Sequence, residues 1–213
     1  MSRTKRLIQF DVDSTFIQQE AIELLAAKAN VFDEVARVTE SAMRGELDFA
    51  ESLRARVALL KGVPESAIAQ VQKEILLTDG AEELVDLLHS RGHCVSLVSG
   101  GFIDIIEPLV ETLNIRHYKA NKLGIENGLL TGQVVGPIVD REAKAIALRE
   151  FAAECNVDLR DTVAIGDGAN DLDMMAIAGV SIAFNAKPVV VAAADYAITE
   201  PSLRSIINFI GDI

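Results

Sequence analysis

The sequence predicts an α/β fold, a doubly wound parallel sheet of the Rossmann type with an inserted helical cap. Short apolar runs alternate with segments of helical periodicity, as in a parallel sheet covered by helices. Three of these runs end in polar, often glycine-rich turns. A long stretch with helical periodicity also separates the first apolar run from the second, and it is too long for a simple crossover connection.

Composition limits the possible functions. The 213 residues are 50% hydrophobic and 24% charged, without an internal repeat, which excludes a disordered or solenoid protein. The net charge is −12 and no Lys/Arg cluster stands out, so we expect no nucleic-acid partner. No apolar run suits a membrane helix or a signal peptide. We therefore expect a cytoplasmic protein with a small-molecule substrate and no membrane partner. The sequence does not determine its oligomeric state.

The two cysteines, Cys94 and Cys155, fit reduced structural thiols better than a disulfide scaffold. Neither has a metal-ligating residue at close sequence spacing.

The first predicted strand begins at Leu7 and runs into Asp11, Asp13, Ser14 and Thr15. A regular strand would place the two carboxylates on one face, about 7 Å apart. Two close, half-buried carboxylates repel each other unless a cation or a proton separates them, which favours a metal site. The alternative is an ordinary polar turn after a strand.

Residues 18–77 show helical periodicity almost throughout and predict about four helices. We expect a cap domain over residues 17–77, inserted into an α/β domain formed by residues 1–16 and 78–213. Candidate helix ends are Asn30, Gly45 and Gly62, and candidate starts are Asp48 and Pro64.

Strand and helix signals alternate after the cap. Asp79 is a candidate N-cap for a helix that stops at Gly92. A strand over 94–98 then ends in Ser99-Gly100-Gly101, before a helix over 102–113 that Pro108 interrupts or bends. A hairpin is expected over 118–135, turning at Glu126-Asn127-Gly128.

In the last part of the chain, Asp140 is expected to cap a helix that carries Lys144 and runs to about Cys155. A strand over 162–165 leads into Gly166-Asp167-Gly168-Ala169-Asn170-Asp171. Further strands are expected over 180–184 and 196–199, with a closing helix over 203–210.

The three polar turns should converge, because parallel strands expose their carboxyl ends at one edge of the sheet. Backbone N–H groups in glycine-rich turns bind anions, and carboxylates bind hard divalent cations, so the pattern indicates a phosphate bound together with Mg²⁺. Lys144 would add positive charge; alternatively it is an exposed lysine on an amphipathic helix. The acidic residues are Asp11, Asp13, Asp167 and Asp171, and the hydroxyl is that of Ser99 at a glycine-rich helix start.

These motifs, in this order, resemble the four motifs of the haloacid dehalogenase superfamily. The cap length and the runs 43–49, 98–102 and 135–139 resemble the phosphoserine phosphatase family within it, and the resemblance covers nearly the whole chain. Phe16 departs from the smaller aliphatic residue that is usual there. This departure puts in question whether the cap moves on its hinge as in the family.

The resemblance implies hydrolysis of O-phosphoserine to serine and phosphate, the last step of serine biosynthesis. Asp11 would be the nucleophile that forms an aspartyl-phosphate, and Asp13 the general acid and base. Mg²⁺ would be held by the carboxylates of Asp11 and Asp167 and by the backbone carbonyl of Asp13.

By the same resemblance, Ser99, the Gly100 N–H and Lys144 would hold the phosphoryl oxygens. Asp171 would orient Lys144 or the metal site, and Asn170 would contact substrate or phosphate.

Recognition of the rest of the substrate is expected from the cap. Arg56 falls within the apolar stripe of the helix that begins at Asp48, where an unpaired guanidinium is costly, and the resemblance assigns it to the substrate carboxylate. The alternatives are an arginine with its charged end in water or paired with a cap glutamate. Glu20 is the candidate for the substrate ammonium, although Glu23 fits the periodicity equally well. Phe49 and Met43 would line the pocket.

Two other functions remain open at this point. A response-regulator receiver also combines a phosphoacceptor Asp with acidic residues, a hydroxyl and a Lys, but it is about half this length and has no cap. A capped phosphatase or phosphotransferase could instead act on another small phosphomonoester, such as phosphohomoserine.

Overall fold

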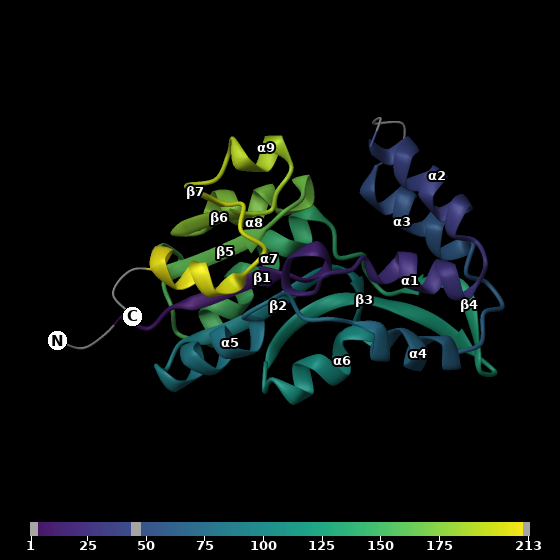
Figure 1. The fold of residues 1–213 in the computed structure, drawn as a ribbon, viewed down its shortest axis with the longest axis horizontal. Helices are drawn as coiled ribbons and strands as arrows, with labels where there is room; N and C mark the ends of the chain where they lie inside the picture. Colours follow the sequence, from purple (N-terminus) through teal and green to yellow (C-terminus); the bar gives the residue numbers. More distant parts are fainter. Residues whose placement is uncertain (1–3, 44–47, 211–213) are drawn as a thin grey trace.

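The structure is a computed structural model that describes residues 4–43 and 48–210. In this part of the chain, seven strands form one sheet in the order β4-β3-β2-β1-β5-β6-β7, parallel except for the β3–β4 pair. The α/β class is confirmed (Figure 1). The strands are β1 (Leu7–Asp11), β2 (Cys94–Phe102), β3 (His117–Glu126), β4 (Leu129–Val135), β5 (Thr162–Gly166), β6 (Val180–Phe184) and β7 (Tyr196–Ile198).

The described helices alternate with these strands except between β1 and β2, where five helices occur, and between β3 and β4, which are joined directly as a hairpin. The helices are α1 (Ala21–Lys28), α2 (Phe32–Met43), α3 (Phe49–Ala58), α4 (Ser66–Glu74), α5 (Ala81–Ser90), α6 (Ile103–Thr112), α7 (Arg141–Glu154), α8 (Leu172–Ile177) and α9 (Pro188–Val191). Short 3₁₀ segments cover Leu159–Asp161, Ala169–Asp171 and Leu203–Phe209, the last being the predicted closing helix. None of the described helices is long and apolar enough to cross a membrane.

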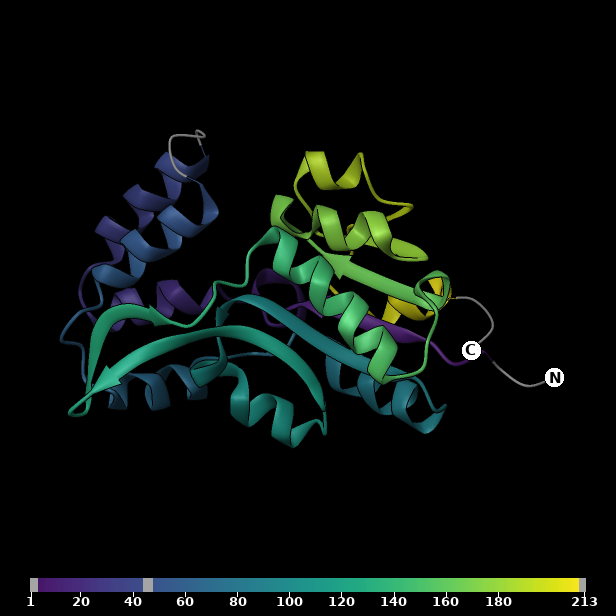
Figure 2. The same cartoon turned by 180° about the vertical axis from the view of Figure 1, so that it is seen from behind.

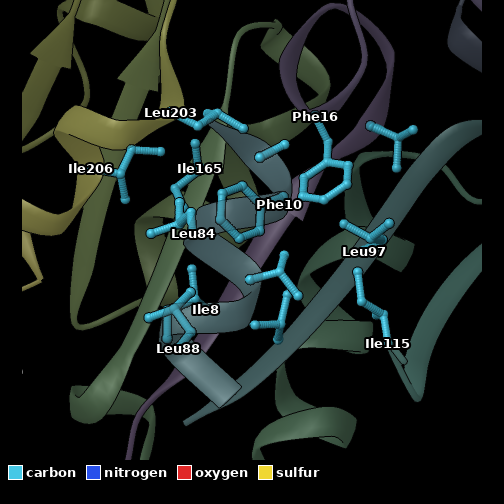
Figure 3. Packing of buried hydrophobic residues seen from close by; sticks show 14 of the residues in the cluster. Ile8, Phe10, Phe16, Leu84, Leu88, Leu97, Ile115, Ile165, Leu203 and Ile206 are labelled. Atoms are coloured by element: carbon cyan, nitrogen blue, oxygen red, sulfur yellow. The ribbon is translucent and has the colours of Figure 1, made fainter. Parts of the chain in front are cut away.

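Helices cover both faces of the sheet (Figures 1 and 2). Alternate residues of β1 point to opposite faces, as strand geometry requires. Ile8 and Phe10 belong to the hydrophobic cluster that includes α5 and α6, whereas Leu7 packs with α7 and α8. Figure 3 shows Phe10 beside Phe16, whose ring centroids lie 5.4 Å apart in an edge-to-face arrangement. The unusual Phe16 is thus fully buried in the hydrophobic cluster that covers this face of the sheet.

Helices α1–α4 contribute most of a second hydrophobic cluster, which also takes in Phe102 and Ile105 at the β2–α6 junction and Leu123 and Leu130 of the β3–β4 hairpin. Figure 1 shows this hairpin reaching from the sheet to these helices. The Gly62 N–H donates to the Leu130 carbonyl (2.8 Å). The segments that enter and leave the helices meet at an antiparallel bridge between Ile17 and Leu77. A separate cap domain stays a prediction, and this packing suggests that the hairpin tip would belong to it.

Glycine and asparagine end several helices as predicted. Asn30, Gly62 and Gly92 follow α1, α3 and α5 with φ of 57°, 83° and 80°, a left-handed conformation that ends a helix at low cost in these residue types. Asp48 caps α3, since its carboxylate accepts the Glu51 N–H (2.7 Å). The candidate stop Gly45 lies outside the described residues, and α4 begins two residues after Pro64, at Ser66.

Two predictions at element ends are wrong. Gly80, with φ of 78°, occupies the N-cap position of α5, and the Asp79 carboxylate instead accepts two hydrogen bonds from Arg204 (3.0 and 2.8 Å). Ser99 and Gly100 do not lie at a helix start, because β2 continues through them to Phe102 and pairs with β3 again beyond a bulge.

Of the two effects expected of Pro108, an interruption is absent from α6, which continues to Thr112, and a bend stays a prediction. A proline lacks the N–H that would bond the carbonyl four residues earlier, here that of Asp104. The Gln72 side chain donates to this carbonyl instead (2.7 Å). A hydrogen bond from α4 therefore compensates for the proline.

Candidate active site

The carboxyl ends of β1, β2 and β5 meet around one cavity, as the three polar turns predicted. The cavity has a volume of about 480 Å³. Three predicted residues, Ser99, Lys144 and Asp171, lie outside its lining and are completely buried. The predicted residues that line the cavity are Asp11, Asp13, Glu20, Phe49, Arg56, Gly100, Asp167 and Asn170.

Lys144 forms a buried ion-pair network with two carboxylates. Its Nζ lies 2.6 Å from Asp11 Oδ1 and 2.8 Å from Asp171 Oδ1. Burial by itself lowers the pKa of Lys144, but the two carboxylates outweigh it and raise this pKa above its usual value. The exposed-lysine interpretation is therefore wrong: helix α7, capped by Asp140, directs Lys144 into the protein.

Asp11, the last residue of β1, is held through one of its two oxygens. Oδ1 accepts hydrogen bonds from the Val12 N–H (2.7 Å) and from Lys144. Among the described residues no group donates to Oδ2, so this oxygen is available for chemistry. Burial, and next the charge of Asp171, raise the pKa of Asp11 well above its usual value, which indicates that the carboxylate needs further positive charge.

Asp13 does not continue the strand geometry that the sequence predicted. It lies in a tight turn over Val12–Phe16, where Ser14 has φ of 56°. Asp13 Oδ1 accepts the Ala21 N–H at the start of α1 (2.8 Å), and Oδ2 accepts the Ser99 hydroxyl (2.8 Å). The two carboxylates therefore have different partners, and Asp13 is anchored by both α1 and β2.

The motif after β5 places Asp167 beside Asp11 and uses Asp171 as a support. Asp171 Oδ2 accepts the N–H groups of Asp167 and Gly168 (3.1 Å each), while its Oδ1 accepts Lys144. Both of its oxygens are occupied, so Asp171 orients its neighbours. Asp167 accepts a hydrogen bond from the Thr15 hydroxyl (3.3 Å), a partner that the sequence did not indicate. Burial, followed by the charge of Asp171, raises the pKa of Asp167 to about 6.

The acidic groups fit a divalent metal ion. Carboxylate oxygens of Asp11, Asp167 and Asp171 all lie within 4.8 Å of one another. Hard divalent cations prefer such oxygen donors. Because both oxygens of Asp171 already accept hydrogen bonds, Asp11 and Asp167 are the better placed carboxylates to hold the ion.

Glu20 and Arg56 lie on the cap side of the cavity. Glu20, just before α1, accepts the Ser14 hydroxyl (2.7 Å), and Glu23 is not among the lining residues. Burial, followed by the charge of Asp13, raises the pKa of Glu20 to about 7. The guanidinium of Arg56 donates through Nε to the Ser52 carbonyl (3.3 Å) and pairs with no carboxylate within 4 Å among the side chains that the structure describes. Burial lowers the pKa of Arg56.

The cavity also brings α3 against β2. A Cβ on Gly100 would lie 2.6 Å from Cζ of Phe49, so only glycine allows this approach. The Gly100 carbonyl accepts a hydrogen bond from the buried Asn121 side chain (2.8 Å). Met43 was also predicted to line the pocket; the structure describes its backbone, at the end of α2, but not its side chain.

Sequence reasoning missed three polar lining residues, Thr39, Ser52 and Arg141. Arg141 begins α7 directly after the capping Asp140, and it forms an ion pair with Asp173. Its position next to that cap was a usable signal, because the amino end of α7 faces the carboxyl edge of the sheet. No comparable sequence signal distinguished Thr39 or Ser52 from other polar residues of the cap helices.

Comparison with known proteins agrees with this geometry. Residues 8–176 match the haloacid dehalogenase-like hydrolase family. A phosphoserine phosphatase from Mycobacterium tuberculosis is 52% identical over 209 residues, which are 98% of this chain and 51% of that protein. One from Streptococcus thermophilus is 49% identical over 213 residues, which are 100% of this chain and 99% of that protein.

A solved structure described as a phospho-aspartyl intermediate analogue of phosphoserine phosphatase superposes with a TM-score of 0.91. It is 42% identical, and the match covers 97% of this chain and 99% of that one. The chain spans about half the length of the Mycobacterium relative and nearly all of the Streptococcus relative. The chain therefore belongs to the haloacid dehalogenase-like hydrolases and, within them, to the phosphoserine phosphatase family.

Proposed function

We propose that this chain hydrolyses O-phosphoserine to serine and phosphate through an aspartyl-phosphate on Asp11. The observation that carries this proposal is the arrangement around one cavity. The buried Asp11, with Oδ2 free of hydrogen bonds, lies in the same lining as Arg56, which has no carboxylate partner in the described chain, and Glu20. These groups complement the phosphate, carboxylate and ammonium of phosphoserine.

The first chemical step is a displacement at phosphorus. Asp11 Oδ2 forms a bond to phosphorus while the bond from phosphorus to the serine oxygen breaks, and Asp13 gives a proton to that departing oxygen. In the second step Asp13 takes a proton from water, whose oxygen attacks the same phosphorus and releases phosphate from Asp11. Lys144 and Asp171 keep Asp11 oriented through both steps.

The donor set favours Mg²⁺ as the divalent ion. The carboxylates of Asp11 and Asp167 and the backbone carbonyl of Asp13 would hold it, and it would supply charge stabilisation for the transferring phosphoryl group. The raised pKa values of Asp11 and Asp167 support this assignment, since a cation between them would favour their ionised forms.

We propose that residues near the carboxyl ends of β2 and β5 contact the phosphate. The Gly100 and Asn170 positions line the cavity and can meet phosphoryl oxygens or substrate. Ser99 is more remote, because it is buried and its hydroxyl donates to Asp13, while its oxygen accepts the Gly101 N–H (2.7 Å). We therefore propose that Ser99 acts at least as much by orienting Asp13 as by touching phosphate.

A receiver-like switch fits this architecture poorly. A phospho-Asp switch needs only the acidic edge, whereas here Glu20, just before α1, and Arg56 of α3 line the same cavity. A phosphatase or phosphotransferase for a different small phosphomonoester uses the same chemistry, and only the substrate distinguishes it.

The test is a panel of small phosphomonoesters, assayed for released phosphate with Mg²⁺. The panel includes L- and D-phosphoserine, phosphohomoserine, phosphothreonine and an aryl phosphate. We expect the highest kcat/KM for a phosphoserine. Asp11→Asn should release less than about 1% of the wild-type phosphate, because an amide is a poor nucleophile and a poor metal ligand. Preference for another member of the panel would refute the substrate assignment, and an active Asp11→Asn protein, checked by mass spectrometry for deamidation, would refute the mechanism.

A further inference from the structure

Two cysteines and a histidine that the proposed function does not use lie together at the opposite edge of the sheet. Cys94 is the first residue of β2, His117 is the first residue of β3, and Cys155 directly follows α7. Parallel strands begin at the edge opposite their carboxyl ends, so this group is remote from the acidic cavity. Their sequence spacing gave no sign of the cluster, since the fold brings three distant segments together.

The three side chains are spaced as ligands of one tetrahedral ion. The two sulfur atoms and an imidazole nitrogen all lie within 4.8 Å of one another, and His117 Nε2 is 3.3 Å from Cys155 Sγ. A tetrahedral zinc ion, with bonds of about 2.3 Å to sulfur and about 2.0 Å to nitrogen, places two sulfur ligands roughly 3.8 Å apart and a sulfur and a nitrogen ligand roughly 3.5 Å apart. Only small side-chain shifts would be needed to reach these separations.

A carboxylate orients the histidine for such a role. His117 Nδ1 lies 2.9 Å from Glu154 Oε2. When Nδ1 carries the proton and donates it to this carboxylate, Nε2 presents its lone pair toward the cysteines. Metal-binding histidines are commonly held by a carboxylate in this manner, which fixes the tautomer and strengthens the ligand. The ring of Phe151 also packs on His117, with centroids 5.6 Å apart.

We propose that Cys94, His117 and Cys155 form a binding site for a thiophilic divalent metal ion of the zinc class. Two thiolates and an imidazole select such an ion over Mg²⁺, which prefers oxygen ligands. Cys155 is buried, whereas Cys94 and His117 are partly exposed, so an ion can enter from solvent and keep water as a fourth ligand. Each coordinated thiol releases its proton to solvent, and no oxidation or reduction is involved.

The alternative use of these residues is a disulfide between the two cysteines. Both are free thiols in the structure. A disulfide would leave the alignment of Glu154, His117 and Cys155 without a role, whereas a metal ion uses every member of it. A bound ion would join the starts of β2 and β3 to the end of α7, and so stabilise this edge without touching the acidic cavity.

The test is a Co²⁺ titration of the metal-stripped full-length protein, kept reduced with a phosphine and supplied with excess Mg²⁺ to occupy the oxygen site. Thiolate ligation of Co²⁺ gives a near-ultraviolet charge-transfer band that oxygen ligands do not produce. We expect one equivalent of Co²⁺ per chain to produce the band and Zn²⁺ to abolish it. His117→Ala should raise the Kd for Co²⁺ more than tenfold, and Glu154→Gln should raise it roughly 10- to 100-fold.

Matched controls lie close by. Glu150→Gln removes a carboxylate from the same helix, one turn earlier, that pairs with Lys119 (2.8 Å), and His89→Ala removes a histidine of α5. Both should leave the Kd for Co²⁺ unchanged. Unaltered phosphate release by every variant shows that each remains folded, and Zn²⁺ should raise the melting temperature of the wild type but not of His117→Ala.

The proposal is overturned if the wild-type protein gives no thiolate band, or if His117→Ala gives the same band with the same Kd. A disulfide between Cys94 and Cys155 in the freshly isolated protein would support the alternative instead. Because the readout is metal binding, the result is independent of whether phosphoserine is the substrate.

Discussion

Replacing Arg56 by alanine should separate substrate recognition from phosphoryl transfer. Arg56 lies on α3 and lines the cavity, where burial lowers its pKa. Among the side chains that the structure describes, its guanidinium makes one hydrogen bond, from Nε to the Ser52 carbonyl (3.3 Å), and no ion pair. Most of its donors are therefore free for a ligand, and a planar guanidinium matches a carboxylate through two parallel hydrogen bonds.

The magnitude follows from removing one partner of a largely buried charged pair, which typically costs about 2–4 kcal/mol. This corresponds to a fall of roughly 30- to 900-fold in kcat/KM for phosphoserine, since about 1.4 kcal/mol is a factor of ten. An aryl phosphate has no amino-acid carboxylate, so its kcat/KM should change little. Arg56→Lys should recover only part of the loss, because an ammonium cannot reproduce the two-pronged contact.

The assay compares kcat/KM for the two substrates in wild type, Arg56→Ala, Arg56→Lys and the control Arg54→Ala. Arg54 is an exposed arginine on the same helix, so its loss should change neither substrate. An equal fall for both substrates in Arg56→Ala would refute the reasoning and assign Arg56 to cap packing or to the phosphoryl centre. Unchanged rates for both would make it an arginine that merely covers the core edge.

Three further predictions concern the metal, Glu20 and Gly101. Phosphate release should vanish in a chelator and return with Mg²⁺. Ca²⁺ should restore it only weakly, because it takes more oxygen ligands at longer distances. Full activity in the chelator would exclude a metal ion from the mechanism. Because the pKa of Glu20 is raised to about 7, its ionised fraction grows with pH, so KM for phosphoserine relative to an aryl phosphate should fall between about pH 6 and 8. Glu20→Gln should remove this trend, and its persistence would assign the titration to another group. Gly101→Ala should lower kcat by up to about 100-fold, because a Cβ there would lie 2.6 Å from Asp13 Oδ2 and displace this carboxylate. An unchanged kcat would show that the orientation of Asp13 is not critical.

The sequence alone determined the architecture and the main chemical groups, because these depend on local patterns. Buried strands such as Leu7–Asp11 and Thr162–Gly166 are short apolar runs, and capping residues such as Asp48 and Asp140 mark helix starts chemically. The convergence of Asp11 and Asp167 followed from a topological rule, that parallel strands end at one edge.

Local patterns failed where a distant segment changed the local preference. Asp79 has the chemistry of an N-cap, but it pairs with Arg204, which lies 125 residues away. Pro108 has the chemistry of a helix breaker, but Gln72 satisfies the carbonyl that the proline leaves unbonded.

Only the tertiary structure decided how the site residues pair. Sequence spacing could not show that Lys144 lies between Asp11 and Asp171, that Ser99 donates to Asp13, or that Glu20 rather than Glu23 lines the cavity. The Cys94, His117 and Cys155 cluster was equally hidden. Each of these contacts depends on the separation and direction of side chains from different elements, and the packing of helices and strands sets both. Sequence periodicity only indicates which face of its own element a residue occupies.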